Sequence, residues 1–265
     1  MNNTDIKKYK RFFAFGCSFT RYEWITWADI IAYHIKESYN YGRSGGGNSY
    51  IFYSLVEANK KHKFTKDDLV MVMWTNTARE DRYVNGEWLT PGNIYTQDFY
   101  PKSFIKEFSC TRGYFLRDML NIESAKIILN STECDWDFLS MVPIEKMSSQ
   151  YEVGLENSQD IIAAFKDNLN IIKPSVYEIL YNFHWQSRLN ELFDDDKWGW
   201  GEHNYKNPHP TPLMHMEYLM SIYNLHFDEV YCDKIKRITD KIKQDKKNIE
   251  LYHHYEHNNI NVVRL

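Results

Sequence analysis

The sequence predicts an α/β fold built on a parallel sheet, and two observations carry this prediction. Short, continuous apolar runs of strand length occur at residues 12–15 and 69–74. Segments with apolar residues at helical spacing lie between and after these runs. Alternation of strands and helices along a chain is typical of a parallel sheet whose strands are joined by helical crossovers.

The first strand is expected at residues 12–15 (FFAF), directly before Gly16. An apolar run of this kind is typical of a strand buried on both faces. Residues 24–35 carry apolar side chains at helical spacing and predict the next helix. A glycine-rich turn over residues 42–48 and a helix over residues 51–60 are expected to follow.

Residues 69–74 (LVMVMW) form the clearest predicted strand. The segment 83–103 is rich in turn residues and predicts a long excursion from the sheet. A helix over residues 114–129 and a strand over residues 135–141 are expected next.

The last part of the chain is expected to be helical where it shows a pattern. Residues 143–207 have no clear periodicity, whereas residues 212–225 predict a helix and residues 233–247 predict an amphipathic one. We find no internal repeat and no low-complexity linker, so we expect a single domain over residues 1–265.

The composition fits a globular protein and argues against several classes of function. Hydrophobic residues make up 43% of the 265 residues and aromatic residues 16%, unlike the aromatic-poor profile of disordered chains. The 32 basic and 36 acidic side chains leave a net charge of -4, which gives no reason to expect binding to nucleic acid or to a membrane surface. No apolar run reaches the ~20 residues that a membrane-spanning helix needs.

The cysteines and glycines indicate neither a metal nor a nucleotide. The four cysteines lie far apart with no C-x-x-C pair, which argues against a zinc site and a disulfide scaffold. The glycine run at residues 45–47 lacks the ending of a P-loop and the spacing of a dinucleotide fold. The first ten residues lack the apolar core of a secretory signal. We therefore expect a cytoplasmic protein with no metal and no cofactor.

A possible nucleophile and a possible oxyanion donor follow the first two extended segments. Ser18 lies in Gly16-Cys17-Ser18, at the join between the first strand and the first helix, where a helix N-terminus stabilises developing negative charge. Gly45 comes after the next extended segment, and a glycine there lets its backbone N–H approach an oxyanion closely. Ligands on open parallel sheets bind beyond the carboxyl ends of strands, which is where both residues are expected.

Two further segments complete the candidate site. Asn76 would place an amide donor at the end of the strand over residues 69–74. His209 precedes Pro210 in a loop before a predicted helix and offers an imidazole as a base. Cys17 is expected to be a buried thiol, because alternation along the strand points it away from the side of Ser18.

These four segments resemble the SGNH branch of the GDSL hydrolases, named after a serine, a glycine, an asparagine and a histidine in that chain order. Gly16-Cys17-Ser18 matches the family's Gly-Asp-Ser segment apart from its middle residue. Gly45 lies five residues after Asn40, as the family's oxyanion glycine lies after an asparagine. Asn76 matches the asparagine of the family's Gly-x-Asn-Asp segment, and His209 precedes a proline as the family's catalytic histidine does.

The resemblance implies a three-layer αβα sandwich with a parallel, flavodoxin-like central sheet. It implies that Ser18 is the nucleophile and His209 the base. The backbone N–H groups of Ser18 and Gly45 and the side-chain amide of Asn76 would form the oxyanion hole.

The family's α/β core needs fewer than 265 residues, so we expect insertions around residues 80–113 and 143–207. Part of the aromatic surplus in these two segments is expected to line the substrate cleft. The residues concerned are Trp88, Tyr95, Tyr100, Trp185, Trp198 and Trp200.

The chain departs from the family pattern at the acid of the triad. Family members carry an aspartate two or three residues before the histidine, where this chain has Asn207 and Lys206. The alternatives are a Ser-His dyad, or a triad completed by a backbone carbonyl, by Glu202 or by one of residues 194–196 (DDD). Glu202, Asn207 and Arg79 are the candidates for a third triad member or a substrate contact.

The expected function is hydrolysis of an acyl ester, with an O-acetyl group on a carbohydrate as the favoured substrate. The sugar part follows from the family resemblance and from the aromatic surplus, because flat aromatic faces suit sugar rings. Two alternatives stay open: an O-acyltransferase that uses the same Ser-His pair, and a weakly active or inactive member that binds a glycan or a protein. The expected partner is thus a small-molecule or carbohydrate ester, with no nucleic acid and no membrane.

Overall fold

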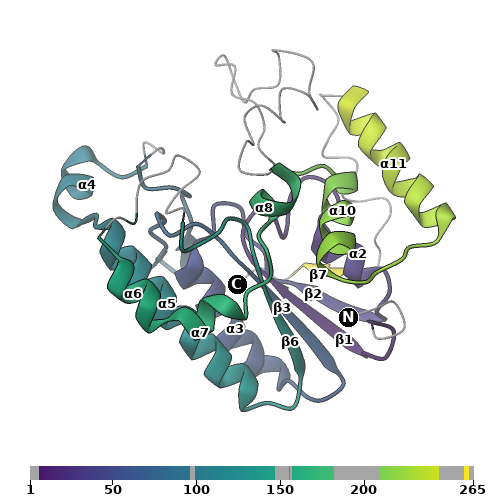
Figure 1. Ribbon diagram of the computed structural model, residues 1–265, viewed down its shortest axis with the longest axis horizontal. Helices are drawn as coiled ribbons and strands as arrows, with labels where there is room; N and C mark the ends of the chain where they lie inside the picture. Colours follow the sequence, from purple (N-terminus) through teal and green to yellow (C-terminus); the bar gives the residue numbers. More distant parts are fainter. Residues whose placement is uncertain are drawn as a thin grey trace.

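A parallel sheet forms the middle layer of the protein. The computed structural model describes residues 6–95, 99–146, 155, 157–181, 209–244 and 260–262. Within them, five strands pair in the order β6-β3-β1-β2-β7, and every neighbouring pair is parallel (Figure 1). These strands are β1 (Arg11–Phe15), β2 (Glu37–Asn40), β3 (Asp68–Trp74), β6 (Asp135–Ser140) and β7 (Ile260–Val262).

Four of the strands follow the order of a flavodoxin-like sheet. The run β2-β1-β3-β6 corresponds to the order 2-1-3-4, and the chain changes direction across the sheet between β1 and β3. The predicted fold class is therefore confirmed. The short strand β7 extends the sheet beside β2, and sequence analysis did not predict it.

Helices cover both faces of the sheet (Figure 1). One layer holds α2 (Trp27–Ala32), α8 (Val176–Tyr181), α10 (Pro212–Ile222) and α11 (Glu229–Gln244). The other holds α3 (Asn48–His62), α5 (Thr111–Asn130), α6 (Gln159–Ala164) and α7 (Lys166–Asn170).

The two layers explain why the strands are apolar without interruption. Successive side chains of a strand point to opposite faces, so Phe12 and Ala14 pack in the cluster under α2 and α10. Phe13 and Phe15 pack in the other cluster, under α3 and α5. Because both faces are covered, no position along β1 after its first residue can be polar without cost.

The first helix is shorter than the helix predicted over residues 24–35. It begins at Trp27 because Thr26 and Asp29 form a capping box, in which the Asp29 carboxylate accepts a hydrogen bond from the Thr26 backbone N–H at 2.7 Å. Trp24 is fully buried in the loop before the helix. The apolar side chain of Trp24 therefore packs in the core although the residue is not part of the helix.

The turn-rich segment 83–103 and the segment 143–207, which has no clear periodicity, contain short helices and strands. The excursion over residues 83–103 holds the antiparallel hairpin of β4 (Arg82–Val84) and β5 (Glu87–Leu89), followed by the start of α4 (Lys102–Phe108). Asn85 and Gly86 close the hairpin with φ angles of 53° and 85°, the left-handed conformation that an Asn-Gly turn supplies. Of the segment 143–207, the structure places α6, α7 and α8.

Among the described residues, no helix combines the length and the apolar character needed to cross a membrane. The same residues contain no group of three or more His, Cys, Asp or Glu side chains that could hold a metal ion. The cytoplasmic location and the lack of a cofactor stay predictions.

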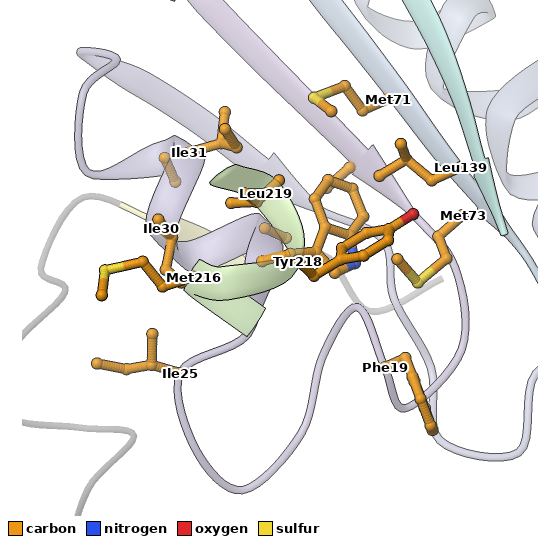
Figure 2. Packing of buried hydrophobic residues seen from close by; sticks show 14 of the residues in the cluster. Phe19, Ile25, Ile30, Ile31, Met71, Met73, Leu139, Met216, Tyr218 and Leu219 are labelled. Carbon is orange, nitrogen blue, oxygen red and sulfur yellow. The ribbon is translucent and has the colours of Figure 1, made fainter. Parts of the chain in front are cut away.

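The cluster between α10, α2 and the sheet anchors the chain segment that follows His209. Figure 2 shows Leu219 and Met216 of α10 near Ile30 and Ile31 of α2. Leu219 is fully buried, whereas the next residue, Met220, is 42% exposed. The inner face of α10 is therefore held to α2 by apolar packing.

This packing predicts a difference between two neighbouring substitutions. Leu219→Ala should lower the free energy of unfolding by about 2–5 kcal/mol, because it removes buried methyl groups and leaves a cavity. Met220→Ala, on the same helix but exposed, should change it by less than about 0.5 kcal/mol. Urea unfolding followed by circular dichroism measures both, and equal small effects would contradict the described packing of α10.

Candidate active site

The loops after β1, β2 and β3 lie at one edge of the sheet and carry three of the predicted site residues. Ser18 follows β1, Gly45 follows β2 and Asn76 follows β3. Because the three strands are parallel, their carboxyl ends share this edge. The strand order reverses between β1 and β3, and this is the place where open α/β sheets bind their ligands.

Ser18 lies in a tight turn directly after β1. The backbone N–H groups of Thr20 and Arg21 both donate to the carbonyl of Cys17, at 3.0 and 3.2 Å. A Cβ atom on Gly16 would lie only 1.9 Å from Thr20 Oγ1, so the turn has no room for a side chain there. The sequence Gly-x-Ser thus allows the sharp bend that presents Ser18.

The central contact of the site joins residues that are 191 positions apart. Nε2 of His209 lies 2.8 Å from Oγ of Ser18. Ser18 is only 6% exposed, and His209 lies in the loop just before α10. This is the separation at which a neutral imidazole accepts a hydrogen bond from a hydroxyl.

Aromatic side chains hold the His209 imidazole in place. The ring of Tyr22 stacks on it with centroids 3.8 Å apart and an interplanar angle of 12°. Phe19 lies on another side, with centroids 5.4 Å apart. The indole Nε1–H of Trp24 donates to the carbonyl of Pro210 at 2.7 Å and so fixes the backbone next to His209.

Burial keeps the His209 imidazole neutral. Burial, together with smaller contributions from the nearby side chains of His215 and Arg79, lowers the pKa of His209 from its usual 6.5 to about 3. The neutral form is the one that can accept a proton from Ser18. His215, buried in α10, also has its pKa lowered by burial to about 3.

The side chain of Asn40 joins the loop after β2 to the loop of Ser18. Its Nδ2 donates to the carbonyl of Thr20 at 2.9 Å, and its Oδ1 accepts from the backbone N–H of Gly42 at 2.9 Å. The spacing of Asn40 and Gly45 in the sequence therefore reflects a connection between the two loops.

Gly45 occupies a position that other residues cannot adopt without strain. Its φ is +71°, in the left-handed region that favours glycine. A Cβ atom there would also lie 2.1 Å from the carbonyl oxygen of Thr90. The loop can therefore take this path only with glycine at position 45.

Asn76 is buried, and its amide is held by Arg79. The Nε–H of Arg79 donates to Oδ1 of Asn76 at 2.6 Å, and its Nη1 donates to the carbonyl of Gly46 at 2.8 Å. Arg79, expected to be a triad member or a substrate contact, thus contacts two segments of the candidate oxyanion site. Trp74, two residues before Asn76, packs edge-on against Phe138 in the core.

Two further polar side chains support the same loops and were not predicted to do so. The amide of Asn48 accepts from the N–H of Thr75 at 2.9 Å and donates to its carbonyl at 3.0 Å. Asp81 accepts from the N–H groups of Gly47 and Tyr50, both at 2.9 Å, and so caps the start of α3. No local sequence signal marks Asp81 as the cap of a helix 30 residues earlier, because the pairing is tertiary.

The remaining predicted residues pack in the core or at the hairpin, or lie outside the described residues. Cys17 is buried, with Sγ 3.8 Å from Sδ of Met141, as its expected role as a buried thiol requires. Trp88 packs with Tyr50, Tyr53 and Tyr83 at the hairpin. The candidates outside the described residues are Glu202, Asn207, Lys206, residues 194–196, Trp185, Trp198 and Trp200.

Comparison with known proteins gives one similarity. No protein-family model matches the chain, and no curated protein matches it either. Among solved structures, the chain is similar to a protein described as a member of the lipolytic protein G-D-S-L family from Veillonella parvula DSM 2008. The identity is 14% and the TM-score 0.44, over 81% of this chain and 98% of that chain.

Substitution of two glycines that both have a positive φ can distinguish the effect of backbone strain alone from the loss of a role in the site. Gly45→Ala should reduce ester turnover by at least about 100-fold, because the added Cβ forces the loop away from Thr90 and displaces a candidate oxyanion donor. Gly86→Ala, at φ +85° with nothing within 4 Å of an added Cβ, carries a similar backbone strain far from Ser18. It should lower stability by about 1 kcal/mol and leave turnover unchanged. Equal turnover of the two variants would exclude a role for the Gly45 loop.

The lowered pKa of His209 predicts activity in mild acid. Since a base is lost only when pH falls through its pKa, kcat/KM for a short ester should stay constant from about pH 8 to pH 6 and decline only well below 6.5. Circular dichroism at each pH controls for unfolding. An acid limb at or above pH 6.5 would contradict a neutral His209 with a lowered pKa.

Proposed function

We propose that this chain is a serine hydrolase of the SGNH type that cleaves an acyl ester. The observation that carries the proposal is the 2.8 Å contact between Ser18 Oγ and His209 Nε2, at the edge where the sheet changes strand order. Gly45 and Asn76 follow the two strands on either side of β1, which supports them as oxyanion donors on both flanks of the proposed nucleophile. The three groups of a nucleophile, a base and oxyanion donors together match acyl transfer.

In the first half of the reaction, Ser18 Oγ forms a bond to the ester carbonyl carbon while its proton passes to His209 Nε2. The carbonyl oxygen becomes an oxyanion, for which the N–H groups of Ser18 and Gly45 and the amide of Asn76 are the proposed donors. Collapse of this intermediate breaks the bond to the alcohol, which leaves with the proton from His209. The product is an acyl group on Ser18.

In the second half, water attacks the acyl carbon and gives a proton to His209. The bond between the carbon and Ser18 Oγ then breaks, Ser18 recovers its proton, and a carboxylic acid is released. If a sugar hydroxyl replaces water, the same steps give O-acyl transfer.

The finer proposal is that the acyl group is short and the alcohol is a carbohydrate. The aromatic residues near His209 support it, since Tyr22 is only partly buried and its ring lies next to the base. An aromatic ring at this position can pack against a sugar ring as well as against the imidazole.

Covalent labelling tests the proposed nucleophile. A fluorophosphonate probe should label the wild-type chain, and Ser18→Ala should abolish labelling and lower turnover of p-nitrophenyl acetate by at least about 10⁴-fold. Ser221→Ala, an exposed serine on α10, is the matched control and should behave as wild type. Labelling that persists in Ser18→Ala would refute the role of Ser18.

The same protein can then separate the related activities. A series of p-nitrophenyl esters of increasing chain length should give the highest kcat/KM for acetyl. Acetylated oligosaccharides should release acetate, whereas transfer of the acyl group to an added sugar would indicate an acyltransferase. A chain with neither labelling nor turnover would be a binding protein.

A further inference from the structure

Arg79 is a buried arginine without a carboxylate partner among the described residues. Its side chain donates instead to Oδ1 of Asn76 and to the carbonyl of Gly46. Arg79 is 8% exposed, so its charge is largely removed from water. Burying a guanidinium costs free energy, which two acceptors on separate loops partly offset.

The neighbouring charges are engaged elsewhere. Arg117 forms ion pairs with Asp118 and Glu80, and Glu80 also pairs with Arg82. Asp81 accepts hydrogen bonds from two backbone N–H groups at the start of α3. Arg79 forms no ion pair with Asp81, although its positive charge acts on the Asp81 carboxyl and on His209, where it contributes a lowering of the pKa beside the larger effect of burial. The guanidinium itself lies next to Asn76.

The contact with Arg79 determines which atom of the Asn76 amide is available. A guanidinium donates hydrogen bonds and has no acceptor, so the atom that it binds must be Oδ1. The Nδ2 group of Asn76 is thereby left available as the donor. Without Arg79, the amide could rotate and present an oxygen to the oxyanion, which would be repulsive.

The backbone around Arg79 is itself fixed. The N–H of Arg79 donates to the carbonyl of Thr77 at 2.8 Å, and its carbonyl accepts from Nη2 of Arg117 at 2.9 Å. A Cβ atom on Gly47 would lie 2.7 Å from Cβ of Arg79, so the close approach of the two loops requires glycine there. The guanidinium is thus held between the loops after β2 and β3.

We propose that Arg79 is the positioning residue of the oxyanion site: it orients the Asn76 amide, ties the Gly45-Gly46 loop to Asn76 and adds a positive charge behind the developing oxyanion. This inference rests on the proposed function. It assigns Arg79 an effect on the transition state and none on the bound ester, which carries no charge at its carbonyl oxygen. Arg79 acts through Asn76 and Gly46.

Kinetics on p-nitrophenyl acetate test this assignment. Arg79→Met should lower kcat by about 100-fold and change KM by less than about 3-fold, because an interaction made only in the transition state is lost. Arg79→Lys keeps the charge but not the two-sided hydrogen bonding, so it should lower kcat by about 10-fold. Binding of a boronic acid, which forms an anionic tetrahedral adduct with Ser18, should weaken in proportion to kcat in both variants. Arg82→Met, at an exposed ion pair, is the matched control and should keep wild-type kinetics.

A double-substitution cycle distinguishes positioning from general structural support. If Arg79 acts through Asn76, the losses in kcat should not multiply. The double variant Asn76→Ala with Arg79→Met should then have a kcat within about 3-fold of that of the slower single variant. Multiplicative losses, or a rise in KM without a fall in kcat, would overturn the inference. If Arg79→Met does not fold, Arg79→Lys alone decides the matter, and its full activity would overturn the inference. Wild-type protein without labelling or turnover would refute the proposed function and this inference with it, whereas wild-type kinetics in Arg79→Met would refute the inference alone.

Discussion

The parallel direction of β2, β1 and β3 is the constraint on which the site depends. Three neighbouring strands that run the same way end at one edge, and their loops carry Gly45, Ser18 and Asn76. In an antiparallel arrangement, one of these loops would lie at the opposite edge of the sheet. Helices on both faces are the consequence of the parallel direction, since each crossover must return the chain to the start of the next strand.

Buried polar side chains then hold the three loops together. Asn40 joins the loop of Ser18 to the loop after β2, Asn48 joins the start of α3 to the end of β3, and Arg79 joins Asn76 to Gly46. Each of these side chains forms a hydrogen bond with a backbone group that has no partner within a helix or strand. Each hydrogen bond also connects two segments of the chain. In the proposed function, these contacts would keep the proposed oxyanion donors in place before substrate arrives, as electrostatic stabilisation of a transition state requires.

The aromatic surplus of the sequence is divided between several places. Trp24, Trp27 and Trp74 are fully buried and belong to the two core clusters. Trp88 belongs to an aromatic group at the β4–β5 hairpin, with Tyr50, Tyr53 and Tyr83. At the site itself, the aromatic contact comes from Tyr22, in the loop after β1 and not in either of the expected insertions. Trp185, Trp198 and Trp200 of the second expected insertion lie outside the described residues.

Apolar runs in the sequence by themselves predicted β1, β3 and β6 and a parallel sheet, and Gly-x-Ser and the spacing of Asn40 and Gly45 marked candidate site segments. The capping box of Thr26 and Asp29 and the Asn85-Gly86 turn are local signals too, but the apolar spacing of residues 24–35 extended the predicted helix beyond the start of α2 at Trp27. No pattern marked β7 as a strand. Only the tertiary structure brought His209 to Ser18 across 191 positions, placed Tyr22 on the imidazole and turned Arg79 toward Asn76. Those contacts join segments that are distant in the chain or lie in irregular loops, where no periodicity records which side chain will meet which.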